Sequence, residues 1–175
     1  MPKPLSKMKI PDPFVMNEDT VNISVWEFLK QKGFDCPNSL KGKQQGIDVQ
    51  GTKLGWMIYV ESKGSHANNH NSDTVFGQGQ IKVHTYNQIG KLMEYKNISN
   101  EKSMYVMANP DVPRIRKRVQ KVAESLDTLG FIRFWIQEDK SIIIEYPVYL
   151  ENQLLQLGLI EQLEHKVSQS FHFVQ

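Results

Sequence analysis

Hydrophobic residues near the start of the chain recur at the spacing of an α-helix. They are Val21, Val25, Phe28 and Leu29, and Gly33 follows them as a stop signal. This pattern predicts a first helix within residues 19–32. The preceding residues, 1–18, carry prolines at positions 2, 4, 11 and 13, which predicts an extended or partly ordered N-terminal arm.

The pattern then changes to that of β-strands. Residues 46–51 predict a short strand, and residues 54–63 (LGWMIYVESK) predict a stronger one that is apolar, β-branched and aromatic. We expect the two strands to pair as a hairpin that turns around residues 50–53. Residues 64–79 are rich in Gly, Ser, Asn and His, which predicts a mobile loop.

Helices and strands alternate through the rest of the chain. We predict a helix over 79–96, a strand over 104–108, a helix that begins near Asp111 and stops at Gly130, strands over 131–137 and 141–146, and a last amphipathic helix over 148–168. This order predicts an α/β fold with a central sheet of mixed strand direction and helices on its faces. Residues 19–175 are expected to form one domain.

Composition excludes several classes of protein. The chain has 175 residues, of which 39% are hydrophobic and 23% charged, as in ordinary globular proteins. It has no apolar run of membrane-spanning length and no secretory signal at its N-terminus. A single cysteine, Cys36, excludes an internal disulfide framework and a cysteine-based zinc site. We therefore expect a cytoplasmic location. A net charge of +2 makes the distribution of charge more informative than its total.

Candidate chemistry lies at the end of the stronger strand. Because side chains alternate faces along a strand, Glu61 and Lys63 point the same way. Burial of a carboxylate and an ammonium there is costly unless they are paired or hold a ligand. If the hairpin forms, Asp48 on the neighbouring strand comes near Glu61. Two carboxylates at close range repel unless a divalent cation lies between them, and an all-oxygen site suits Mg²⁺ or Mn²⁺.

The Glu-x-Lys triplet by itself is weak evidence, because the chain contains four. They begin at Glu61, Glu94, Glu138 and Glu164. Only the first one ends an apolar strand and has an aspartate on an adjoining strand. The context of the triplet therefore selects residues 61–63. The competing interpretation is that Asp48 caps a turn and that Glu61 and Lys63 form a surface ion pair.

With Asp48 and Glu61-Ser62-Lys63, residues 20–146 resemble the PD-(D/E)xK phosphodiesterase superfamily, the restriction-endonuclease-like nucleases. The resemblance implies an αβββαβ core with additional C-terminal strands and a helix. It also implies that Asp48 and Glu61 bind the metal, with the backbone carbonyl of Ser62 as a further ligand, and that Lys63 assists the attacking water. Ile47 stands where the family's signature has proline, which is a departure from the pattern.

The resemblance suggests two supporting residues, each with an alternative. Glu27 is a candidate further acid from the first helix, but the sequence Ser24-Val25-Trp26-Glu27 also fits a capping box. Gln80 lies where family members often place a glutamine that faces the site. Gln78 and Gln88 compete with it for this role, and a solvated helix start is the other interpretation.

Basic residues form a stripe on the predicted helix after Asp111. Arg114, Lys117, Arg118 and Lys121 follow the i, i+3, i+4, i+7 spacing of one helix face. This stripe is a candidate surface for binding nucleic-acid phosphates. The alternative is an ordinary solvated face. His66 and His70 have metal-ligand spacing but lie among Gly, Ser and Asn, which favours a phosphate-contacting or mobile loop over a zinc site.

These observations lead us to expect a Mg²⁺- or Mn²⁺-dependent nuclease that acts on DNA. The loop 64–79 is expected to close over the substrate. Two alternatives are a nucleic-acid-binding module of the same fold without cleavage and an RNA nuclease of the same chemistry. A third is an interaction subunit in which the acids are surface charges. The C-terminal leucines are expected in the core but also offer a seam for a homodimer.

Overall fold

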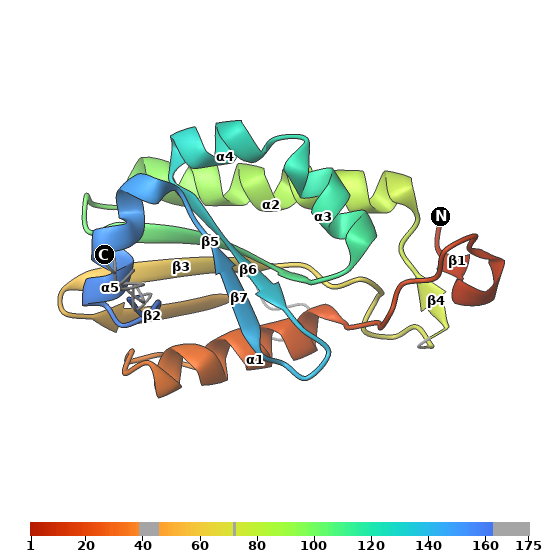
Figure 1. Ribbon diagram of the computed structural model, residues 1–175, viewed down its shortest axis with the longest axis horizontal. Helices are drawn as coiled ribbons and strands as arrows, with labels where there is room; N and C mark the ends of the chain where they lie inside the picture. Colours follow the sequence, from red (N-terminus) through yellow and green to blue (C-terminus); the bar gives the residue numbers. More distant parts are fainter. Residues whose placement is uncertain (39–45, 72, 163–175) are drawn as a thin grey trace, which may run out of the picture.

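The computed structural model describes residues 1–38, 46–71 and 73–162. At its centre lies a five-stranded sheet (Figure 1), whose strands are, in spatial order, β2 (Val49–Lys53), β3 (Trp56–Ser62), β5 (Ser103–Pro110), β6 (Phe131–Ile136) and β7 (Ile142–Glu145). β3, β5 and β6 run parallel, whereas β2 and β7 pair antiparallel with their neighbours. The predicted α/β fold with a mixed sheet is confirmed.

Helices cover both faces of this sheet. α1 (Glu18–Gln31) lies on one face, and α2 (Gln78–Ile98), α3 (Pro113–Gln120) and α4 (Ala123–Leu129) lie on the other (Figure 1). Side chains alternate between two hydrophobic cores: Ile58 and Val60 of β3 pack on the α1 side, whereas Tyr59 between them packs on the α2 side. Every residue of β6 is buried, as expected for a strand covered on both faces.

α1 begins and ends where the sequence predicts, to within one residue. The Asn17 side chain accepts a hydrogen bond of 2.8 Å from the Thr20 amide and caps the helix. Gly33 follows the helix with a φ of +82°, a left-handed conformation that glycine adopts without strain. The capping residue puts Glu18 in the first turn of α1, where a carboxylate favours the helix dipole.

β2 and β3 form the predicted hairpin, but its turn differs from the prediction. Residues 50–53 belong to β2, and the chain turns at Leu54 and Gly55, whose φ angles are +50° and +78°. Two consecutive positive φ values suit a tight two-residue hairpin turn. The register pairs Val49 with Val60, so the next position along, Asp48, lies beside Glu61.

The single helix predicted between Asp111 and Gly130 is two helices. Val112, not Asp111, occupies the N-cap of α3, and Pro113 takes the first turn. The Asp111 carboxylate instead pairs with the Arg116 guanidinium and accepts a hydrogen bond of 2.7 Å from Gln137 Nε2. α3 ends at Gln120, and the next helix, α4, begins at Ala123. Gly130 caps the C-terminus of α4 with a φ of +75°.

The last helix is much shorter than the predicted 148–168. A 3₁₀ turn, η2 (Val148–Leu150), leads into α5 (Glu151–Gln156), and Gly158 follows with a φ of +71°. Leu154 and Leu157 are buried in the core on the α1 side, as predicted for the C-terminal leucines. Residues 163–168 lie outside the described part of the chain, and the homodimer stays a prediction.

The N-terminal arm and the loop after β3 hold each other in place. β1 (Lys3–Pro4) pairs antiparallel with β4 (Thr74–Val75), and a 3₁₀ turn, η1 (Leu5–Lys7), follows β1. Ser65 and Met16 are joined by a backbone hydrogen bond of 2.7 Å. The loop is thus tied to the arm at both ends, and the mobility predicted for residues 64–79 stays a prediction. Of the three strands in the αβββαβ order, β4 lies outside the main sheet.

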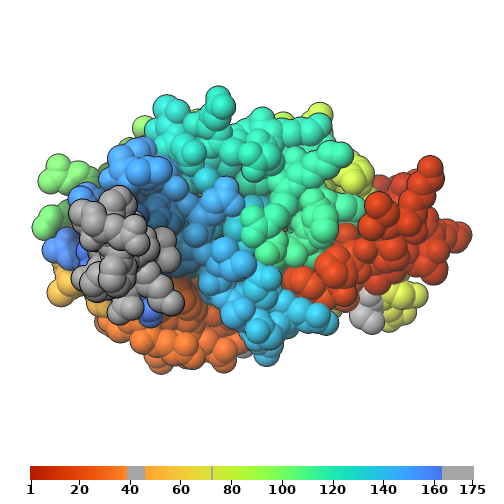
Figure 2. Space-filling model, viewed as in Figure 1, coloured from red at the N-terminus to blue at the C-terminus, as the bar shows by residue number. Residues whose placement is uncertain are grey.

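The space-filling view shows the arm at one end of the molecule, in contact with α3 (Figure 2). Its anchor is Asp12, whose carboxylate pairs with Arg114 of α3. Within the described ranges, none of the helices combines the length and the apolar character needed to cross a bilayer.

Candidate functional site

Asp48 and Glu61 lie side by side at one end of the β2–β3 hairpin. Both carboxylates are buried, with exposed fractions of 8% and 3%. Asp48 Oδ2 accepts a hydrogen bond of 2.8 Å from the backbone N–H of Ser62. This contact continues the pairing of β2 with β3 by one position and orients the Asp48 side chain toward the end of β3. The predicted proximity of the two acids is confirmed.

Lys63 lies beside the same two strands. Its Nζ is 3.3 Å from Glu61 Oε1 and 3.0 Å from Glu18 Oε2 in the first turn of α1. Its backbone N–H donates to the carbonyl of Ala108 in β5, which extends the parallel pairing past the end of β3. Strand pairing therefore fixes the backbone of Lys63, while two carboxylates fix its ammonium group.

α2 contributes a second cation and an amide. Lys91 Nζ lies 2.7 Å from Glu61 Oε2, so each oxygen of Glu61 has its own lysine. The buried Gln88 donates from Nε2 to the carbonyls of Glu61, at 2.7 Å, and Ala108, at 3.2 Å. Its Oε1 accepts a hydrogen bond of 3.2 Å from Asn109. Gln88 thus connects α2 to the ends of β3 and β5.

We refer to Glu18, Asp48, Glu61, Lys63 and Lys91 as the carboxylate cluster. It holds three carboxylates against two ammonium groups. Burial, and then the charge of Asp48, raise the pKa of Glu61 to about 7, because Lys63 and Lys91 only partly offset them. Burial lowers the pKa of Lys63, but the charges of Glu61, Glu18 and Asp48 outweigh it and leave that pKa raised. The cluster is therefore short of positive charge at neutral pH.

A small cavity of about 10 Å³ separates Lys63 from α2 and α3. His84, Thr85, Asn109 and Ile115 are among its lining residues, and its size is about that of one water molecule. Burial and the neighbouring charge of Lys63 lower the pKa of His84, which keeps its imidazole neutral at pH 7. The His84 side chain therefore lies close to Lys63 of the cluster.

Two of the predicted supporting residues lie elsewhere. Glu27 is exposed on α1, and Ser24 forms no capping box with it because its hydroxyl bonds the Thr20 carbonyl in the middle of the helix. Gln80 Oε1 accepts a hydrogen bond of 3.0 Å from the Gly77 amide and so caps α2. Gln88, considered only as a competitor to Gln80, is the glutamine beside the cluster.

Glu18 and Lys91 are the cluster members that sequence reasoning missed. Lys91 carries a readable signal, because positions 84, 88 and 91 are polar at i, i+4, i+7 spacing on a helix that also packs against the sheet. Polar residues aligned in this way on an inward face need partners in the fold. Glu18 carries no such signal, since an acid in the first turn of a helix is common for dipole reasons alone.

The cluster offers a limited but chemically suitable set of metal ligands. Two adjacent buried carboxylates short of positive charge match Mg²⁺, which is often bound through one or two carboxylates and retains several waters. The Ser62 peptide, whose N–H already faces Asp48, adds a carbonyl in the same strand end. In the described residues no group of three or more His, Cys, Asp or Glu side chains is placed to hold a metal. His66 and His70, the other candidate ligands, belong to no such group.

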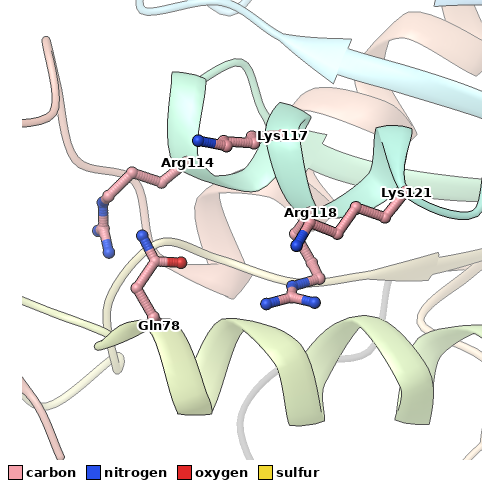
Figure 3. A pocket seen from close by; sticks show the side chains of 5 residues that line it. All are labelled: Gln78, Arg114, Lys117, Arg118 and Lys121. Atoms are coloured by element: carbon pink, nitrogen blue, oxygen red, sulfur yellow. The ribbon is translucent and has the colours of Figure 1, made fainter.

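The predicted basic residues of α3 are not equivalent. Arg114 donates to both oxygens of Asp12, at 2.8 and 2.5 Å, and to the Phe76 carbonyl at 2.8 Å, so it anchors the arm and the loop to α3. Lys117 and Lys121 are exposed, and Arg118 is half-buried. All four residues line one groove beside the start of α2 (Figure 3).

Comparison with known proteins leaves the family open. No protein-family model matches the chain, and no curated protein matches it. Among solved structures, the chain is similar to an fdxN element excision controlling factor protein from Anabaena variabilis, with a TM-score of 0.44 and 14% sequence identity. The similarity covers 72% of this chain and 97% of that chain. A likeness at this level carries no argument about function.

Proposed function

We propose that this chain is a metal-dependent nuclease of the PD-(D/E)xK type that hydrolyses phosphodiester bonds in DNA. One observation carries the proposal: Asp48 and Glu61 are buried side by side with Lys63 at one strand end, and the pKa of Glu61 is raised to about 7. Such an arrangement is expensive in free energy and is typical of sites that bind a cation. The residues at 48 and 61–63 are also those that carry the resemblance to the family.

Each residue of the site then has a defined task. Asp48, Glu61 and the Ser62 carbonyl would hold Mg²⁺ or Mn²⁺, which lowers the pKa of bound water and neutralises charge on a phosphate oxygen when present. Lys63 adds a cation where negative charge develops on the phosphate. Glu18 orients the Lys63 ammonium through their contact of 3.0 Å. Gln88 fixes the Glu61 backbone by its hydrogen bond to the carbonyl.

The proposal is tested by titrating Mg²⁺ and Mn²⁺ with supercoiled plasmid, single-stranded DNA and RNA as parallel substrates. We expect the protein to cleave DNA in the presence of metal and Glu61→Gln to lose at least about 100-fold in rate, because the amide cannot serve as an anionic ligand. Glu94→Gln, an exposed glutamate of α2, is the matched control and should cleave like the wild type.

Isothermal titration calorimetry with Mn²⁺ gives a readout that does not depend on cleavage. Glu61→Gln should bind Mn²⁺ more weakly than Glu94→Gln, while circular dichroism shows both variants folded. Cleavage by folded Glu61→Gln at the wild-type rate would exclude the proposed site. Cleavage of RNA but not DNA would retain the chemistry and change the substrate.

A second candidate function is a nucleic-acid-binding module of the same fold without cleavage. The specific observation in its favour is that both oxygens of Glu61 already contact lysines, Lys63 at 3.3 Å and Lys91 at 2.7 Å. A metal ligand must be released from such contacts before it can bind a cation. DNA binding without nicking under every metal tried would favour this function over the nuclease.

A further inference from the structure

The groove beside the basic stripe is formed by two helices from different parts of the chain. It has a volume of about 150 Å³ and is lined by Gln78 of α2 and by Arg114, Lys117, Arg118 and Lys121 of the α3 segment. In Figure 3, Arg114 and Arg118 extend from α3 toward α2, and Gln78 extends from the start of α2 toward α3. Among the described residues no carboxylate lines the groove, so Lys117, Arg118 and Lys121 have no acidic partner in its walls. Arg114 differs from them because it is paired with Asp12 of the arm.

A second cavity continues the groove along the N-terminal arm. Its volume is about 370 Å³, and its lining consists of Lys3, Lys7, Met8, Lys9, Ile10, Gln78 and Arg114. Gln78 and Arg114 line both cavities, so the two are neighbours rather than separate hollows. Within the part of the chain that the structure describes, no acidic side chain lines the second cavity either. We call the seven cations of the two linings the basic track: Lys3, Lys7, Lys9, Arg114, Lys117, Arg118 and Lys121.

The arm lysines are held in this place by the fold. β1 pairs with β4, and the bidentate contact of Arg114 with the nearly fully buried Asp12 fixes the arm against α3. On the α3 side, Arg118 Nε is buried and has no hydrogen-bond partner among the described residues, which leaves donor capacity on a guanidinium that lines the groove. The arm is therefore one wall of a preformed basic surface.

We propose that the basic track binds the phosphate backbone of the nucleic acid several nucleotides away from the phosphate that reacts. The inference rests on the proposed function for the nature of the ligand. Seven cations in two connected hollows suit a chain of phosphates, whereas a single small anion would occupy one hollow only, and a flat lipid surface does not follow a concave one. Arginine and lysine together supply both directional and point-charge contacts to phosphate.

The length of α2 between Gln78 and Gln88 gives the distance between the track and the carboxylate cluster. Gln78 lines the track, and Gln88, ten residues later in the same helix, bonds the Glu61 carbonyl. Ten helical residues span about 15 Å, which corresponds to roughly four nucleotides of one strand at the B-DNA rise. The track would therefore hold the substrate outside the reacting nucleotides and contribute binding rather than chemistry.

Fluorescence anisotropy with a 5′-fluorescein 20-nucleotide DNA strand, single or in a duplex, tests this inference in EDTA, where no cleavage occurs. We compare the wild type with Lys117→Ala/Lys121→Ala and with Lys7→Ala/Lys9→Ala. The matched control is Lys96→Ala/Lys102→Ala, which removes the same charge from the last turn of α2 and from the segment that follows it, at the end of the helix away from Gln78. We expect each track variant to bind on the order of tenfold more weakly than the control.

The salt dependence separates phosphate contacts from general loss of charge. If both substituted lysines contact phosphates, the slope of log K against log salt falls by about 1.4 on the single strand and about 1.8 on the duplex. The control should keep the wild-type slope. Equal weakening in the control and the track variants, with equal slopes, would overturn the inference.

Failure of this inference and failure of the proposed function have different signatures. If DNA binds through the track lysines but no metal supports cleavage, the nuclease is wrong and the binding surface stands. If cleavage of DNA depends on Glu61 but substitution of the track lysines changes neither binding nor KM, the proposed nuclease function is supported and the proposed binding role of the track is wrong.

Discussion

The carboxylate cluster and the basic track are both rich in charge, but they differ in how that charge is balanced. In the cluster, Glu61 is 3% exposed and each of its oxygens contacts a lysine. In the track, Lys117 and Lys121 are exposed, and none of the described residues that line their groove is a carboxylate. A buried charge must be paired inside the protein, whereas an exposed charge is solvated by water and is free to bind a ligand from solution.

This difference predicts which property of the protein a substitution in each region will change. Changes in the cluster should alter chemistry and pH dependence, because its groups interact in a medium of low polarity. Changes in the track should alter affinity and salt dependence, because its groups are screened by water and ions. Arg114 is the exception within the track, since it is committed to Asp12.

The largest expected effect separates rate from binding. Lys63→Ala should reduce kcat by about 100-fold with little change in KM, because its ammonium acts as charge develops on the phosphate. Lys117→Ala/Lys121→Ala should do the reverse and raise KM while kcat is retained. Steady-state kinetics on one DNA substrate measures both, with Lys102→Ala as the control. The distinction between the two regions fails if both variants change KM alone.

A large effect is also expected on the pH dependence of stability. The pKa of Glu61 rises from 4.5 to about 7 on folding, so between these pH values the folded chain retains a proton that the unfolded chain has released. Raising the pH through this window therefore lowers the free energy of unfolding, by about 3 kcal/mol at most.

Urea unfolding at pH 5 and pH 7.5 measures that contribution. Glu61→Gln should lose most of the decrease, because glutamine does not titrate, and Glu94→Gln should keep it. A wild-type pH dependence in Glu61→Gln would show that Glu61 does not titrate in this range.

An intermediate effect distinguishes two arginines of the same helix. Arg114→Met should lower the free energy of unfolding by about 2 to 3 kcal/mol, because it leaves the buried Asp12 carboxylate without its partner. Arg118→Met, which breaks no hydrogen bond or ion pair that the structure shows for Arg118, should change it by less than about 0.5 kcal/mol. Chemical denaturation of both variants provides the measurement. Equal stabilities would contradict the anchoring role of Arg114.

The smallest effect concerns the second lysine on Glu61. Lys91 lowers the pKa of Glu61 through a contact of 2.7 Å, so Lys91→Gln should move that pKa above about 7. NMR titration of ¹³C-labelled glutamate side chains follows it directly, with Lys82→Gln as the control on the same helix. An unchanged or lower pKa in Lys91→Gln would mean that Lys91 does not act on Glu61.

Several features of the fold were readable because they depend on local pattern. The helix at 19–32 has apolar residues at helical spacing and a glycine at its end, and α1 matches it to within one residue. The hairpin of β2 and β3 was readable for the same reason, and with it the meeting of Asp48 and Glu61. Its turn was misplaced because Leu54 adopts a positive φ that its residue type does not announce.

Other features depend on contacts between distant segments. The predicted final helix ends early because Gly158 turns the chain, and Leu157 and Leu159 then pack into the core beside α1. Gln80 was a plausible site residue from its position, yet it caps α2 while Gln88 reaches the strand ends. Sequence spacing restricts each residue to a helix face but does not say which neighbour that face will meet.

The sequence by itself determined the helix at 19–32, the paired strands at 49–62 and the proximity of Asp48, Glu61 and Lys63, because hydrophobic periodicity and strand alternation act over a few residues. Only the tertiary structure decided that Gln88 and Lys91 contact Glu61 and that Glu18 contacts Lys63. It also decided that the N-terminal arm joins α3 in the basic track. Those contacts join residues that are far apart in the chain. Their charges need partners only when they are buried, and they become buried only when the chain folds.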